Sequence, residues 1–257
     1  MSEIPQEPRK KRSVLLIVSL CLALLAVAAA VYLMGSTEDH SFSMLILGDS
    51  QMAGSGWEGG YANCVSETYP NALVINLAQP GSLLANGDIH QQWEFFLSEA
   101  SYMPDYVLLD GGANDLPHLQ KEEFKENGLE LVSYALCDLI ERIHEENPDT
   151  HIIYTLMPPL LEWKDSDDGP PAYDVQRRYW KQLHRIANAY DYVTVVDLFS
   201  INPFQFPSQG NYRKYFADSI HLNEAGYRKS FEYIRNILTA QLEMQEEEDA
   251  SVNGGSD

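Results

Sequence analysis

The chain has 257 residues, of which 38 are acidic and 17 are basic, and its formal net charge at pH 7 is −21. Hydrophobic residues make up 45% of it, a share typical of a globular protein, and the length suits one well-filled domain. A surface of this charge repels nucleic acid and anionic lipid headgroups, so we expect no nucleic-acid partner. The favoured interpretation of the charge is that it keeps the domain soluble.

The N-terminal part of the chain carries a membrane signal. A basic segment, residues 1–13, precedes an apolar stretch at residues 14–34. In helical form this stretch spans about 30 Å, the thickness of the hydrocarbon core of a bilayer. Because basic residues precede it and acidic residues follow it, the positive-inside tendency places residues 1–13 in the cytoplasm. We therefore expect a transmembrane anchor at residues 14–34 and a linker at residues 35–41, in a protein that crosses the cell membrane once with its C-terminal domain outside.

A cleavable signal peptide is the alternative interpretation of this segment. The small residues at positions 26–30 resemble signal cleavage sites, and a cleaved protein would be secreted. The apolar stretch is longer than a usual signal core, which favours the uncleaved anchor. Both interpretations place the C-terminal domain outside the cytoplasm.

Short apolar runs alternate with longer amphipathic stretches in residues 42–241. We expect strands at Met44–Leu47, Leu73–Leu77, Tyr106–Leu109, Ile152–Leu156 and Val193–Val196. We expect helices at Gln91–Ser101, Lys121–Glu146, Tyr173–Ala189 and Glu224–Met244. This alternation predicts one α/β domain, with a parallel sheet of about five strands and helices on both faces. The acidic residues 242–257 are expected to form a disordered tail.

Polar motifs follow the first three predicted strands and precede the last predicted helix. Ser50 comes three residues after the first strand, Gly81 four residues after the second and Asn114 five residues after the third. Asp218 and His221 lie in the loop before the last helix. Ligands of open parallel sheets bind beyond the carboxyl ends of the strands, so we expect all five residues at one edge of the sheet.

Three of these residues are of the types needed for nucleophilic catalysis. A serine hydroxyl requires an adjacent base, and we expect His221 to activate Ser50. Asp218 lies three residues before His221, a spacing at which a carboxylate can orient the imidazole ring. Taken alone, Ser50 could be only a helix N-cap, and Asp218 and His221 could be only a surface turn.

Gly81 and Asn114 are candidates for binding a developing oxyanion. Gly81 offers a backbone N–H that no side chain blocks, Asn114 offers a side-chain amide, and the amide of Ser50 could be the third donor. Taken alone, Gly81 could belong to an ordinary turn after Pro80, and Asn114 could form an Asx turn with Asp115.

In these motifs the chain resembles the SGNH hydrolases, the GDSL esterase/lipase family, from about Met44 to about Leu238. Their hallmark serine, glycine, asparagine and histidine match Ser50, Gly81, Asn114 and His221 in family order. The resemblance implies a flavodoxin-like three-layer α/β/α fold without a metal or an organic cofactor. It also implies a triad of Ser50, His221 and Asp218 that attacks an ester or thioester carbonyl.

Together these features predict an extracytoplasmic serine esterase. The expected substrates are acyl esters, above all O-acetyl esters of glycans, with short-chain lipid esters second. We name Trp57, Tyr61 and Trp163 as candidate sugar-stacking residues, although aromatic side chains more often pack in a core. The alternatives are an O-acyltransferase that uses the same acyl-enzyme, or a tethered glycan-binding module whose catalytic site has decayed.

Two cysteines lie in the expected domain. Cys64 and Cys137 could form a disulfide outside the cytoplasm, or they could be two free thiols. The sequence alone leaves both possibilities open.

Overall fold

The computed structural model describes residues 40–118, 127–160, 173–205 and 209–253. The expected anchor, the linker up to residue 39 and Trp163 lie outside these ranges, and so does the first part of the helix expected from Lys121. Among the helices within the described ranges, none has both the length and the apolar character needed to cross a membrane.

Five parallel strands form one sheet in the order β2-β1-β3-β4-β5. The strands are β1 (Ser43–Leu47), β2 (Leu73–Asn76), β3 (Tyr106–Leu109), β4 (His151–Leu156) and β5 (Val193–Asp197). Each predicted strand is present, with bounds that differ by at most one residue at either end. This strand order is that of flavodoxin-like doubly wound sheets, so the predicted α/β class is confirmed.

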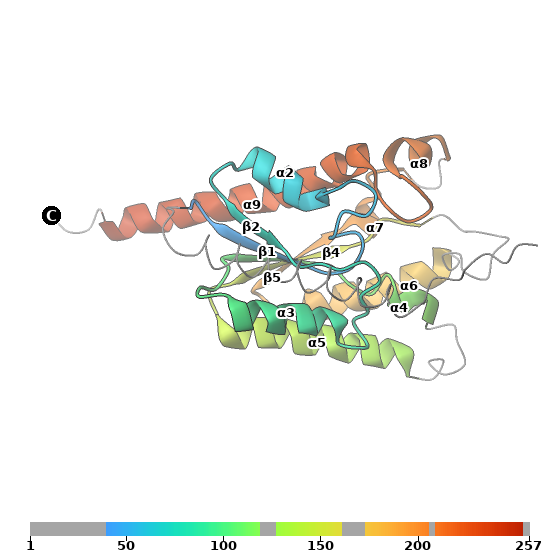
Figure 1. Cartoon of the computed structure of the whole chain (residues 1–257), viewed down its shortest axis with the longest axis horizontal. Helices are drawn as coiled ribbons and strands as arrows, with labels where there is room; N and C mark the ends of the chain where they lie inside the picture. The colour runs from blue at the N-terminus through green and yellow to red at the C-terminus, as the bar shows by residue number, and fades with distance from the viewer. Residues whose placement is uncertain (1–39, 119–126, 161–172, 206–208, 254–257) are drawn as a thin grey trace, which may run out of the picture.

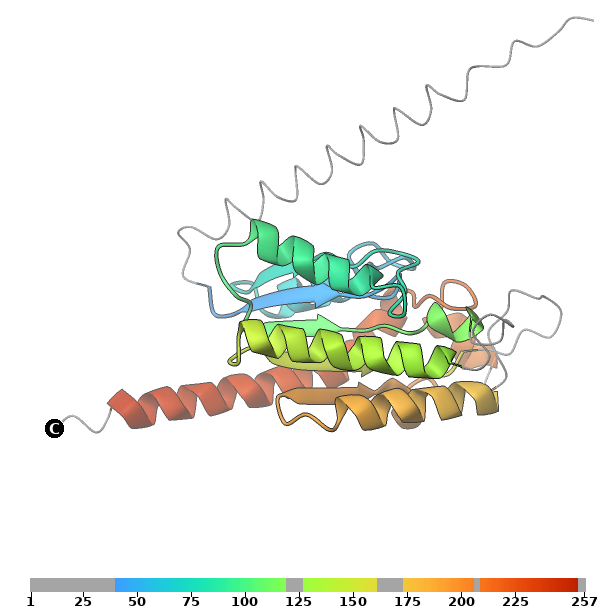
Figure 2. The ribbon, with the colours of Figure 1, turned by 90° about the horizontal axis from the view of Figure 1, so that it is seen from below.

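Helices cover both faces of the sheet. They are α2 (Gly60–Thr68), α3 (Asp88–Glu99), α4 (Asp115–His118), α5 (Gly128–Glu146), α6 (Tyr173–Ala187), α7 (Leu198–Ile201), α8 (Gln209–Tyr215) and α9 (Glu224–Asn253). Helices α3, α5 and α6 lie on one face, and α2 and α9 lie on the other (Figure 1). Figure 2 shows the first group from below, in front of the strands.

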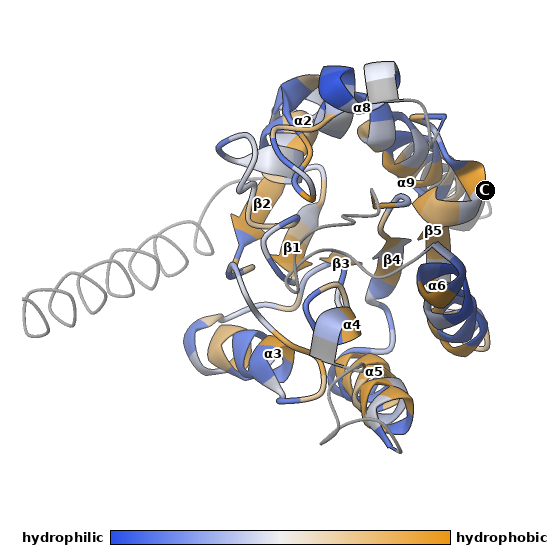
Figure 3. Ribbon diagram, turned by 90° about the vertical axis from the view of Figure 1, so that its right-hand side faces the viewer, coloured by the Kyte–Doolittle hydropathy of each residue, from blue (hydrophilic) through white to orange (hydrophobic). Residues whose placement is uncertain are grey.

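The core lies on both faces of the central strands. All residues of β1 and β3 are buried, and the end view of Figure 3 shows the apolar strands between the two helical layers. Strands covered on both sides need apolar residues at consecutive positions, which explains why these runs do not alternate with polar residues.

The last helix is longer than the sequence pattern predicts. Helix α9 continues to Asn253, although residues 242–253 were expected to belong to a disordered tail. Glutamine, leucine, glutamate and methionine at residues 241–247 are good helix formers, and they extend a helix that is already nucleated. The expectation of disorder was therefore wrong for this part, whose end projects past the sheet (Figures 1 and 2).

Candidate active site

The site lies at the carboxyl edge of the sheet, where the loops after β1, β2 and β3 meet the loop before α9. Ser50 follows β1 by three residues. The loop that carries Asp218 and His221 is held closed by an antiparallel bridge between Phe216 and Leu222. In addition, the amide of Ala217 donates to the carbonyl oxygen of His221 over 2.8 Å. The histidine therefore lies on a short, braced loop directly before a long helix.

Ser50, His221 and Asp218 form a continuous chain of hydrogen bonds, as the sequence predicts. The His221 Nε2 atom lies 3.0 Å from the Ser50 hydroxyl oxygen, and the Nδ1 atom lies 2.7 Å from Oδ2 of Asp218. If Nδ1 carries its proton toward the carboxylate, Nε2 is left to accept the proton of the serine. This arrangement is that of a nucleophile, its base and the group that orients the base.

The carboxylate of Asp218 is held in its charged form. Its Oδ1 atom accepts the backbone N–H groups of Ile220 and His221, over 2.8 and 2.7 Å. Partial burial alone would raise the pKa of Asp218, but the hydrogen bonds from the His221 ring and these two amides outweigh burial and lower the pKa. The negative charge of Asp218 therefore faces the Nδ1 atom of the His221 ring.

Ser50 is not a helix N-cap. After β1 the chain makes successive turns, in which the amide of Ala53 bonds to the carbonyl of Asp49 and that of Ser55 bonds to the carbonyl of Ser50. The first helix after β1 is α2, and it begins only at Gly60. The N-cap alternative is therefore wrong, and the Ser50 hydroxyl is left to bond with His221.

The two predicted oxyanion donors lie on loops that are bonded to each other. Asn114 donates one proton of its side-chain amide to the carbonyl of Ser82, over 3.0 Å, so its second proton stays available. The backbone N–H groups of Ser50 and Gly81 make no hydrogen bond to any described residue. Gly81 has φ of 87°, and a Cβ atom there would meet nothing within 4 Å. This position thus favours glycine because of its left-handed backbone, and the surroundings of its N–H group are open, as expected from the sequence.

Two buried glutamines, which sequence reasoning missed, join the loops of the site. Gln51 donates to the carbonyl of Ile220 over 2.6 Å and so connects the serine loop to the histidine loop. Gln92, on α3, accepts from the amide of Gly48 and donates to its carbonyl, each over 2.9 Å, and it also donates to Ser82. A lone glutamine, whether in a loop like Gln51 or in a helical pattern like Gln92, gives no sequence signal for such a role.

Two buried carboxyl groups lie close to the turn that carries Ser50. Asp49 is fully buried, and Oδ1 of the nearly buried Asp110 accepts its backbone N–H over 3.0 Å. Burial, reinforced by the charge of Asp115, raises the pKa of Asp49 to about 6, although a hydrogen bond from Gln51 and the nearby His221 act against this. Burial and the charge of Asp49 raise the pKa of Asp110 well above its ordinary value. The sequence offered one signal for Asp110, a carboxylate directly after a buried strand.

Comparison with known proteins identifies the family. The sequence profile of the GDSL-like lipase/acylhydrolase family matches residues 46–229, the greater part of the chain. The chain belongs to this family. It is therefore a carboxylic ester hydrolase of the GDSL or SGNH type. None of the curated proteins matches the chain.

Solved structures share the fold of the hydrolase. A protein from Lactobacillus plantarum is 18% identical, with a TM-score of 0.60, and the match covers 79% of the hydrolase and 99% of that protein. A lipase/acylhydrolase from Enterococcus faecalis is 18% identical, with a TM-score of 0.57 and coverage of 78% and 96%. A catalytic mutant of an acetylxylan esterase from Geobacillus stearothermophilus is 19% identical, with a TM-score of 0.54 and coverage of 76% and 94%.

The structure describes two of the three candidate sugar-stacking residues, and these two differ in their exposure to solvent. Tyr61 is 2% exposed, and its hydroxyl bonds to that of Ser230 over 2.8 Å, so it packs between α2 and α9 and cannot stack on a substrate. Trp57 is partly exposed and has the guanidinium of Arg228 5.0 Å from its ring centroid. The role of Trp57 stays a prediction, and Trp163 lies outside the described residues.

The hydrolase has two free cysteines within the described residues. Cys64 lies on α2 and Cys137 on α5, which cover opposite faces of the sheet, and neither forms a disulfide. Burial raises the pKa of the Cys64 thiol to about 12, so this group stays protonated and unreactive. No group of three or more acidic, histidine or cysteine side chains within the described ranges could hold a metal ion.

Proposed function

We propose that this hydrolase is an extracytoplasmic serine esterase in which Ser50 is the nucleophile. The observation that carries the proposal is the hydrogen-bond chain from Ser50 through His221 to Asp218. As the Ser50 oxygen attacks the ester carbonyl carbon, its proton passes to Nε2 of His221. The imidazolium that forms is stabilised by the negative charge of Asp218.

The attack moves negative charge onto the former carbonyl oxygen. The amides of Ser50 and Gly81 and the free proton of the Asn114 side chain are the donors we assign to this oxygen. His221 then gives its proton to the leaving alcohol, and the ester C–O bond breaks to leave an acyl group on Ser50. Water attacks this acyl-enzyme with His221 again as base, which releases the acid and restores the serine.

The proposed substrates are O-acetyl esters of glycans, with esters of short-chain lipids second. One protein that shares the fold is an acetylxylan esterase, and we extend an acetylated glycan substrate to this chain on that basis. The proposed location is the outer side of the cell membrane, with residues 14–34 as a single-pass anchor, or outside the cell if this segment is cleaved.

Replacing the nucleophile tests this function. Ser50→Ala should lower kcat/KM for p-nitrophenyl acetate by about 10⁴-fold or more, because no other group can form the acyl-enzyme. Ser55→Ala is the matched control, since this serine lies exposed in the same loop. Thermal unfolding should show that both variants fold like the wild type. Full activity of Ser50→Ala would refute the mechanism.

A further inference from the structure

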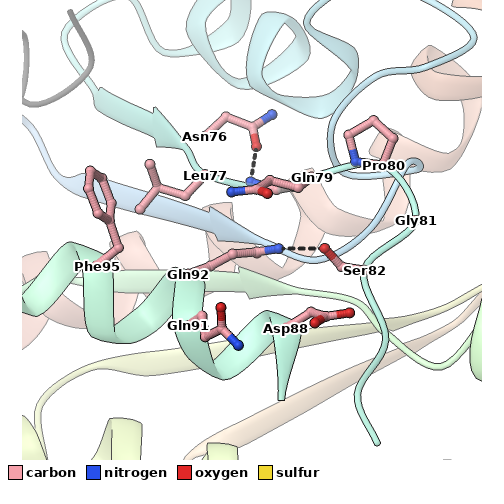
Figure 4. Close-up of a pocket in the computed structure, with 11 residues that line it drawn as sticks. Asn76, Leu77, Gln79, Pro80, Gly81, Ser82, Asp88, Gln91, Gln92 and Phe95 are labelled. Carbon is pink, nitrogen blue, oxygen red and sulfur yellow. Dashed lines mark hydrogen bonds between the residues drawn. The ribbon is translucent and has the colours of Figure 1, made fainter. Parts of the chain in front are cut away.

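A groove runs along the side of the sheet, directly beside Gly81. It has a volume of about 530 Å³ and lies between the segment after β2 and the helix α3. Its lining comes from residues 76–82 together with Asp88, Gln91, Gln92 and Phe95 (Figure 4). Because α3 returns along the sheet, Phe95 lies about two helical turns farther from the catalytic edge than Asp88. The groove therefore begins at a proposed oxyanion donor and leads away from it.

The hydrogen-bonding groups in the groove fall into two sets. The amides of Asn76 and Gln92 are used within the protein, to Met52 and Ala78 and to Gly48 and Ser82 respectively. The side chains of Gln79 and Gln91, in contrast, are exposed and bond to no described residue. Asp88 uses one carboxylate oxygen to accept the amide of Leu83.

The free groups at the surface of the groove suit a sugar better than an acyl chain. A carboxamide both donates and accepts, as a sugar hydroxyl does, and Gln79 and Gln91 supply two of them from opposite walls (Figure 4). The partly buried ring of Phe95 offers an apolar surface for the C–H face of a sugar ring. A long acyl chain would need a continuous apolar wall, and these polar side chains interrupt it.

The negative charge in and around the groove disfavours negatively charged sugars. Asp88 lies in the groove, and the whole chain has a net charge of −21, so uronic acids and other anionic sugars are disfavoured. The volume lies within the range of about 300–1,000 Å³ that ligand pockets usually have. We propose that the groove binds the alcohol part of the substrate, as a neutral oligosaccharide that continues from the acylated sugar. This inference rests on the esterase function proposed above.

The test compares two esters that differ in whether they can reach the groove. Acetylated xylo-oligosaccharides extend into it, whereas p-nitrophenyl acetate occupies only the region around Ser50. The ratio of kcat/KM for the first substrate to that for the second should fall about threefold in Gln91→Ala. In the double variant Gln79→Ala/Gln91→Ala it should fall about tenfold, mostly through KM of the oligosaccharide. Gln182→Ala, on the distant helix α6, is the matched control and should leave the ratio unchanged.

A binding measurement makes the result independent of catalysis. Isothermal titration of Ser50→Ala with unacetylated xylo-oligosaccharide should show binding that weakens about tenfold when Gln79→Ala/Gln91→Ala is added. An unchanged ratio in folded variants would overturn the groove assignment, and so would a wild type that cleaves p-nitrophenyl acetate but no acetylated oligosaccharide. A wild type that cleaves neither ester would refute the esterase function itself.

Discussion

Asp49 lies directly before Ser50, and its side chain is fully buried. Its Oδ2 atom is buried without a hydrogen-bond partner among the described residues, and the buried Asp110 lies against its backbone. A buried negative charge is costly, and two that interact cost more. The raised pKa of each group follows from this cost, and it links the stability of the fold to pH.

The raised pKa values determine whether the stability of the fold rises or falls with pH. Between about pH 4 and the raised values, the folded chain holds protons on Asp49 and Asp110 that the unfolded chain has lost. Stability therefore falls as pH rises through this window. Asp110→Asn removes one of the two acids and keeps an oxygen that can accept the amide of Asp49.

We predict that Asp110→Asn stabilises the fold at pH 7 by about 2 kcal/mol, and by almost nothing at pH 4. Urea unfolding of the wild type and the variant at both pH values measures this difference. Asp149→Asn is a control, because this aspartate is exposed in the turn before β4. A variant that is less stable than the wild type at pH 7 would contradict the assignment of the two buried acids.

At the scale of the elements, the serine loop and the histidine loop touch at Gly56. A Cβ atom at this position would overlap the carbonyl oxygen of Leu222 and come within 3.0 Å of Cβ of His221. Backbone atoms cannot give way as a flexible side chain can. The 3.0 Å bond between Ser50 and His221 therefore depends on a glycine that belongs to none of the predicted motifs.

We predict that Gly56→Ala lowers kcat for p-nitrophenyl acetate by about 100-fold, because separating the loops lengthens the bond between serine and histidine. Circular dichroism should show a folded protein. Gly87→Ala is the control, since a Cβ there meets nothing within 4 Å although φ is 77°. It should cost about 1 kcal/mol of stability and leave kcat nearly unchanged. Equal losses of activity in both variants would argue against the close approach at Gly56.

The elements and the positions of the candidate catalytic residues at one edge of the sheet were predictable because each has a local signal. Buried parallel strands are short apolar runs, and Ser50, Gly81 and Asn114 follow them at short spacings. Gln51, Gln92 and Gly56 were not predictable, because their roles arise only when distant loops meet. Tyr61 was misjudged for the same reason, since its burial depends on the packing of α9 against α2.

On the scale of the whole molecule, α9 divides into a part that builds the core and a part that extends beyond it. Tyr227, Ile234 and Leu238 are fully buried, whereas Met244 is 55% exposed. The acidic end of the chain thus adds charge and helix length but buries none of the large apolar side chains described. The sequence indicated the charge of this end correctly but not its helical structure.

We predict that a chain ending at Gln245 keeps the melting temperature and the esterase activity of the full-length protein. A chain ending at Asn236 loses Leu238, whose buried side chain contributes about 2–5 kcal/mol, and should unfold at a clearly lower temperature. Differential scanning calorimetry of both truncated chains measures this contrast. A large loss of stability in the longer chain would show that the acidic end supports the fold.

The central claim is that Ser50 is a nucleophile activated by His221 and Asp218, and covalent labelling tests it most directly. The wild type should react with an organophosphonate probe to give a single adduct, which intact-mass measurement detects and peptide mapping locates at Ser50. Ser50→Ala should give no adduct, and His221→Ala should react far more slowly because the serine lacks its base. A folded wild type that stays unlabelled, or an adduct of equal yield on Ser50→Ala, would contradict the mechanism.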